Sequence, residues 1–165
     1  MKIRKHKIIF VSSIVAVIIS IVVLFVLINN CLDPYYRPNK EKMEKFFIRD
    51  KECLVIIKDY FINNPIATYI SSLDFKSTNY SKLIKEEDVA LAFNYLFKNG
   101  YTGVGKQGNT IYFLKWTRGS NLGIGIIYLI NNENQPELQY ITKLEALSES
   151  GWYFYESDYI KWKTQ

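Results

Sequence analysis

An uncharged, strongly apolar segment near the N-terminus, residues 8–28, constrains this chain more than any other feature. Seventeen of its 21 residues are Ile, Val, Leu or Phe, and the other four are Ala or Ser. A helix rises about 1.5 Å per residue, so the segment would be about 31 Å long, which matches the hydrocarbon core of a bilayer. A helix that packs on a soluble core keeps a polar stripe, and this segment has none. We therefore predict a transmembrane helix over 8–28, with the lipid bilayer as its partner.

The flanks of this segment favour its retention over cleavage. Four basic residues among the first seven resemble the start of a signal peptide, but the apolar core is longer than the usual 7–15 residues or so. Signal peptidase needs small residues before its cut, whereas this segment is followed by Asn29, Asn30 and Cys31. Lipid attachment to Cys31 would likewise need a small residue in place of Asn30.

The orientation of the helix follows from the basic residues near its ends. The four N-terminal charges lie directly against the segment, whereas the first basic residue on the other side, Arg37, comes nine positions after Ile28. The numbers of basic residues within about 15 residues of the two ends differ little, so the distance of these residues from the helix sets its expected orientation. We predict a single-pass protein of the cell membrane with a cytoplasmic N-terminus. Its parts are the basic flank 1–7, the transmembrane helix 8–28, a juxtamembrane linker 29–40 and an extracytoplasmic domain 41–165.

The composition of the predicted outer domain excludes several function classes. Of the 21 Lys and Arg residues 17 follow the apolar segment, as do all 16 acidic residues, so charge gives no reason to expect nucleic-acid binding. The only histidine, His6, lies in the basic flank. This excludes Ser-His-Asp and Cys-His catalysis and the usual Cys/His zinc sites within the domain, and we predict no metal or cofactor. Whether Cys31 and Cys53 pair is left open.

Periodicity predicts the elements of the domain. Apolar residues at helical spacing indicate helices over about 39–62 and 86–98. Residues 66–73 fit either a strand or a helical turn, with a strand preferred. Strands are expected at 110–116, 123–130, 138–142 and 152–155, and a short helical turn at 157–162. The prediction is an α+β fold, with about two helices packed on an antiparallel sheet of three to five strands.

Gly103, Gly105 and Gly108 spell the G-x-G-x-x-G pattern of dinucleotide-binding proteins. That pattern requires the glycines to follow a strand and to lie at the start of a helix. Here they follow a helix and precede a strand. We therefore interpret them as a glycine-rich loop that needs positive φ angles, and not as a nucleotide site.

Aromatic residues crowd the last 50 positions and suggest a binding surface. In a strand over 152–155, alternation places Trp152 and Phe154 on one face and Tyr153 and Tyr155 on the other. One face should belong to the core, and the other is either covered by a helix or exposed to a partner. The candidate binding residues are Tyr153, Tyr155 and Trp162, and we identify no catalytic residue.

Three functions are compatible with these features. The first is a non-enzymatic, membrane-anchored domain that binds a protein or a cell-wall polymer. The second is a membrane-bound carbohydrate or cell-wall hydrolase that uses paired carboxylates, which requires two acids about 5–9.5 Å apart in a cleft. The third is an immunity-type protein that protects its own cell from a toxin.

Overall fold

The computed structural model of the chain describes residues 18–22, 37–77, 84–119, 122–130, 135–158 and 160. Residues 18–22 are helical, and the remainder of the predicted transmembrane segment 8–28 lies outside the described residues. Within the described ranges, no helix has both the length and the hydrophobicity needed to cross a membrane. The chain divides into two compact units after Arg37, and all elements named below belong to the second unit.

The first long helix of this unit, α2 (Lys40–Asn63), forms where the sequence predicts it. The Asn39 side chain caps its start by accepting a hydrogen bond from the Lys42 backbone N–H at 3.0 Å. The helix ends at Asn64, whose backbone N–H donates to the Tyr60 carbonyl at 2.9 Å. Its predicted apolar face is buried completely, and consists of Met43, Phe47, Leu54, Ile57 and Phe61.

The second long helix, α5 (Glu87–Lys98), is also confirmed. Two acids in its first turn and Lys98 in its last turn complement the helix dipole. Gly100 follows it with a φ of 83°, a left-handed conformation that glycine adopts without a steric penalty. Between the two helices, the ambiguous stretch becomes strand β1 (Tyr69–Ser71) and the short helix α3 (Ser72–Ser77).

The six strands form one antiparallel sheet, in the spatial order β1-β2-β3-β4-β6-β5. The remaining strands are β2 (Gly103–Gln107), β3 (Thr110–Arg118), β4 (Leu122–Leu129), β5 (Ile141–Ala146) and β6 (Trp152–Asp158). The α+β fold class is therefore confirmed, but the prediction of three to five strands is wrong, since the described residues alone form six.

Strand β2 accounts for part of this difference, because Gly103 and Gly105 lie within it and not in a loop. Alternation along the strand puts both glycines on one face. A Cβ atom at Gly103 would lie 2.8 Å from Cζ of Tyr69, and one at Gly105 would lie 2.6 Å from Cζ of Tyr112. The glycines thus provide room for tyrosine rings. Only Gly108, in the turn after the strand, has the predicted positive φ, at 54°.

Two C-terminal predictions also need correction. Strand β5 begins at Ile141 and reaches Ala146, further along the chain than the predicted 138–142. Ser157 and Asp158 were expected in a helical turn, but both belong to β6, where they pair with Gly123 and Leu122 of β4. Long-range pairing with β4 extends the strand beyond its aromatic run.

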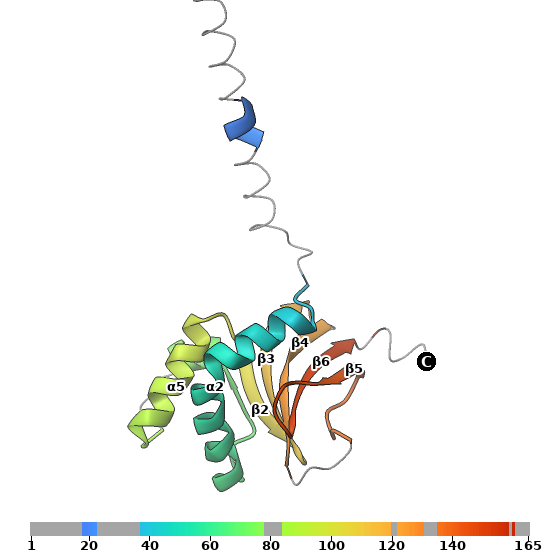
Figure 1. Cartoon of the computed structure of the whole chain (residues 1–165). Coiled ribbons are helices and arrows are strands. Elements are labelled where there is room, and N and C mark those ends of the chain that lie inside the picture. Colours follow the sequence, from blue (N-terminus) through green and yellow to red (C-terminus); the bar gives the residue numbers. More distant parts are fainter. Residues whose placement is uncertain are drawn as a thin grey trace, which may run out of the picture. The chain divides into compact units, whose positions relative to one another are not determined.

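The main core lies between the helices and one face of the sheet. Figure 1 shows α2 and α5 on the same side of the sheet, and their buried faces share one hydrophobic cluster with inward residues of the strands. Those strand residues include Val104, Ile111, Phe113, Ile124, Ile126, Trp152 and Phe154. This face will be called the helix face, and the opposite face of the sheet the loop face.

Candidate ligand groove

A loop, and not a helix, covers part of the loop face. Residues 135–140, here called the crossing loop, precede β5 and are held against the turn between β2 and β3. Asn109 donates from Nδ2 to the Gln135 carbonyl at 2.9 Å and accepts from the Glu137 backbone N–H at 3.0 Å. Gln107 donates from Nε2 to the Glu137 carbonyl at 3.0 Å. These contacts fix where the loop passes over the sheet.

Leu138 of the crossing loop closes a second, smaller core on the loop face. It packs against a buried cluster of Ile127, Leu129 and Tyr155, which also contacts partly buried residues of β3, β5 and β6. The loop covers only part of this face, and a hollow lies on each side of Leu138.

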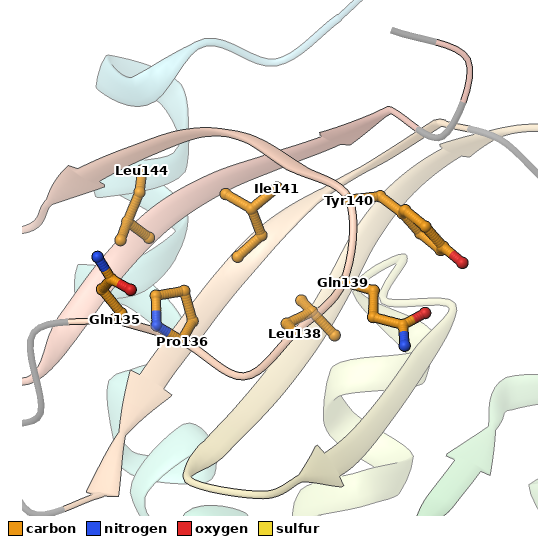
Figure 2. Close-up of a pocket in the computed structure, with 7 residues that line it drawn as sticks. All are labelled: Gln135, Pro136, Leu138, Gln139, Tyr140, Ile141 and Leu144. Atoms are coloured by element: carbon orange, nitrogen blue, oxygen red, sulfur yellow. The ribbon is translucent and has the colours of Figure 1, made fainter. Parts of the chain in front are cut away.

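The larger hollow has a volume of about 560 Å³, within the range of about 300–1,000 Å³ that is usual for small-molecule sites. The smaller one, of about 460 Å³, lies beside β5 and is drawn in Figure 2. The larger hollow will be called the groove. Its lining residues are Gln107, Tyr112, Leu114, Thr117, Gly119, Leu122, Gly123, Leu138, Gln139, Tyr140, Tyr155 and Ser157.

The chemistry of the groove is neutral, because none of these twelve lining residues carries a charge. Two side-chain amides, Gln107 and Gln139, and two aliphatic hydroxyls, Thr117 and Ser157, provide both donors and acceptors. The remainder of the surface is apolar or aromatic. Such a groove can hold an uncharged ligand through hydrogen bonds and ring contacts.

Three tyrosines lie next to one another on the loop face. The rings of Tyr69 and Tyr112 are stacked, with centroids 6.2 Å apart and planes at 21°. Burial raises the pKa of Tyr155, and the neighbouring Tyr112 and Tyr69 raise it further, as expected when phenol groups are close. Within the described residues, no hydrogen bond to these three hydroxyls is found, so the half-buried Tyr112 can offer its hydroxyl to a ligand in the groove.

Tyr140 stands at the boundary of the two hollows in a strained conformation. Its φ is 63°, and for a residue with a Cβ atom this left-handed conformation costs about 1–2 kcal/mol. In Figure 2, Gln139 and Tyr140 extend away from Leu144 and the other apolar residues of the smaller hollow. Strain of this kind is often found at functional sites, so it marks this turn as a candidate contact for a ligand.

The three binding residues predicted from sequence have different outcomes. The alternation in β6 is as predicted, because Trp152 and Phe154 belong to the core of the helix face, whereas Tyr153 and Tyr155 belong to the loop face. Tyr155 is only 1% exposed and lines the groove floor, so it cannot form part of an exposed strip. Tyr153 is half-buried, and Trp162 lies outside the described residues.

Apart from Tyr155, the groove residues were not identified from sequence. One local signal was present: Gly103 and Gly105 in β2, and Gly123 and Gly125 in β4, are each two positions apart. In a strand, that spacing leaves one face without side chains. The crossing loop offered no comparable signal.

The helix face contains a buried charge. The Asp50 side chain is fully buried and accepts two hydrogen bonds from the Arg49 guanidinium, both at 2.7 Å, and a longer one from the Tyr95 hydroxyl at 3.3 Å. Nearby, the Lys115 ammonium lies over the rings of Phe46 and Tyr101, and burial lowers the pKa of this lysine to about 8. Because Asp50 is paired with Arg49 and Lys115 is enclosed by rings, we interpret the cluster as structural.

Carboxylates gather in a different hollow, of about 270 Å³, at the C-terminal end of α2 and the start of α5. Its lining includes Asp59, Glu86 and Asp88, and Asp59 forms an ion pair with Lys58 at 2.9 Å. In the described part of the chain, no group of three or more His, Cys, Asp or Glu side chains is arranged to hold a metal ion. Cys53, on α2, is half-buried and forms no disulfide bond within the described residues.

Comparisons of the chain with protein-family models, with curated proteins and with solved structures found no match.

Proposed function

We propose that this chain is a membrane-anchored binding protein whose outer domain holds a protein or cell-wall partner in the groove on the loop face. The observation that carries the proposal is the groove itself, a hollow of about 560 Å³ with an uncharged lining on the face of the sheet that the helices leave uncovered. Binding sites are usually concave and mostly apolar, with a few placed polar groups. The groove has this composition.

The membrane part of the proposal is supported by the sequence. Segment 8–28 is uncharged over 21 residues, and basic residues flank its N-terminal side. We propose that it anchors the domain to the outer face of the cell membrane, with the N-terminus in the cytoplasm. Resistance to alkaline extraction of membranes tests the anchor. Protection of the domain from protease in intact cells, and its digestion after lysis, would reverse the orientation.

Site-specific photo-crosslinking in intact cells tests the binding function without knowledge of the ligand. A photo-reactive residue at Gln139 would lie at the groove, and a matched one at the exposed Asn94 would lie on α5, away from the loop face. We expect a discrete crosslinked product from position 139 and none from position 94. Absence of any product from position 139, or the same products from both positions, would contradict the proposal.

The alternative, a hydrolase with paired carboxylates, would need a site other than the groove, whose described lining has no Asp or Glu. The hollow with Asp59 and Asp88 is the place to test it. Hydrolysis of a cell-wall or oligosaccharide substrate by the full-length protein, with loss of activity in both Asp59→Asn and Asp88→Asn, would favour this alternative.

A further inference from the structure

Three properties of the groove limit the class of ligand it can hold. Its lining is uncharged, and its side chains include both hydrogen-bond donors and hydrogen-bond acceptors. The backbone of its floor is already hydrogen-bonded within the sheet. Each excludes or favours a class of ligand on physical grounds.

Charge is the first constraint. A charged ligand that enters the groove would lose water without gaining a partner of opposite charge, and this penalty is large for an isolated charge. Of the charged side chains described above, Arg49, Asp50 and Lys115 belong to the helix face, and Asp59, Glu86 and Asp88 line a separate hollow. The groove therefore favours a neutral occupant.

The paired backbone is the second constraint. Extended peptides commonly bind by adding a strand to the free edge of a sheet, so that the main chain provides most of the affinity. Here Tyr112, Gly123 and Tyr155 lie on β3, β4 and β6, and each of these strands has a neighbour on both sides. The groove floor thus presents side chains and no free strand edge, which disfavours an extended peptide.

Hydrogen-bonding chemistry is the third constraint. A sugar ring carries hydroxyls that both donate and accept, and it has an apolar face of C–H groups. The amides of Gln107 and Gln139 can bind those hydroxyls, as can Tyr112, whose hydroxyl has no hydrogen-bond partner within the described residues. The rings of Tyr112 and Tyr140 provide apolar surface with a polar end.

Glycines in the strands determine where the rings of Tyr112 and Tyr155 lie. Tyr112 packs over Gly105, and Tyr155 packs over Gly125, where a Cβ atom would lie 2.9 Å from its Cε1. Side chains at these two positions would displace the rings. Because these positions are glycines, the tyrosine rings that form the floor of the groove lie close to the backbone, and the space above the rings is open.

We propose that the groove binds a neutral saccharide chain, an assignment that rests on the proposed binding function and specifies its ligand. Gln107 of β2 and Gln139 of the crossing loop bind the sugar hydroxyls. Tyr112 contributes its hydroxyl, and Tyr140 packs against a ring at the mouth of the groove.

Calorimetric titration of the full-length protein, in a detergent without a sugar head group, tests this assignment. The probes are a tetramer of N-acetylglucosamine, a tetramer of glucose, an anionic tetramer of galacturonic acid and a neutral, end-capped peptide of similar mass. We expect at least one neutral tetramer to bind, and the anionic tetramer and the peptide to bind at least about tenfold more weakly.

Two variants locate the binding. Gln139→Ala removes an amide and Tyr112→Phe removes only a hydroxyl, and each should weaken neutral tetramer binding roughly three- to tenfold, as expected for a lost hydrogen bond. Asn94→Ala removes an exposed amide on α5 and should leave binding unchanged. Circular dichroism of each variant shows whether the fold is retained.

Each contrary outcome has a defined meaning. Tighter binding of the peptide or of the anionic tetramer overturns the saccharide assignment and leaves the binding function in place. Binding that neither Gln139→Ala nor Tyr112→Phe weakens places the site elsewhere and also overturns it. If no probe binds, the saccharide assignment is wrong, and the crosslink from position 139 in cells separately decides whether the groove binds any partner.

Discussion

The two faces of this sheet are made by the same strands, yet they have different chemistry. On the helix face, side chains such as Phe113 and Phe154 are sealed by α2 and α5, and the one buried carboxylate, among the described residues, is held by Arg49. On the loop face, tyrosines pack over glycines, and the crossing loop leaves a neutral groove open. We therefore expect the helix face to provide most of the stability, and we propose that the loop face serves recognition.

The largest expected difference between the faces is in stability. Phe93 of α5 is fully buried, and its ring lies 5.8 Å from those of Phe75 and Phe97 and 6.3 Å from that of Phe61. Phe93→Ala should lower the free energy of unfolding by about 3–5 kcal/mol in chemical denaturation. The half-buried Tyr153 of the loop face is the matched site, and Tyr153→Ala should cost less than half as much. Equal losses would remove the distinction between the faces.

The buried carboxylate should contribute the next largest effect. Asp50→Ala removes two charge-assisted hydrogen bonds from Arg49, which is itself partly exposed and can regain water. We expect a loss of about 2–3 kcal/mol in the free energy of unfolding. The control is Glu41→Ala, which breaks the exposed pair with Lys45 and should cost at most about 1 kcal/mol. A loss no larger than that of the control would show that Asp50 is not a structural residue.

The enclosed lysine of the helix face predicts a pH dependence. Burial lowers the pKa of Lys115 to about 8, below the 10.5 of an unfolded lysine. Between these values the unfolded chain binds a proton that the folded chain has released, so stability attributable to this group rises with pH. After allowance for solvent screening, the rise is on the order of 1 kcal/mol.

Denaturation of the wild-type protein and of Lys115→Met at pH 7.5 and 9.5 measures this contribution. The wild type should gain stability relative to Lys115→Met as the pH rises. A constant difference between the two proteins would show that Lys115 stays protonated in the folded chain, held by the rings of Phe46 and Tyr101 at 4.4 and 4.1 Å.

The smallest effect is expected on the loop face, with the opposite sign. Tyr140→Asn places a residue that tolerates positive φ in the strained turn, and it should leave the free energy of unfolding unchanged or raise it by up to about 1 kcal/mol. The same variant should weaken binding of the neutral tetramer, because the ring at the mouth of the groove is lost. A clear loss of stability would indicate that Tyr140 packs as a structural residue.

Regular local patterns allowed much of the fold to be predicted. The faces of α2 and α5 follow from helical spacing, and the alternation of Trp152 and Tyr153 follows from strand spacing. Strand β2 was not predicted, because glycines such as those at 103 and 105 are typical of loops. In the structure both glycines lie in a strand, with tyrosine rings packed over them. The candidate site was predicted only in part, since Tyr155 lines the groove but is buried.

The sequence by itself determined the uncharged segment 8–28, the absence of histidine from the remainder of the chain after it, and the apolar faces of the helices, because these depend on residues that are neighbours along the chain. Tertiary structure alone decided that the groove exists. Its lining combines Gln107, Tyr112 and Tyr155 with Gln139 of the crossing loop, and these residues meet only because strand pairing and the contacts of Asn109 bring the loop across the sheet. Contacts between positions so far apart leave no periodic pattern, and for this reason the groove on the loop face could not be predicted from the sequence.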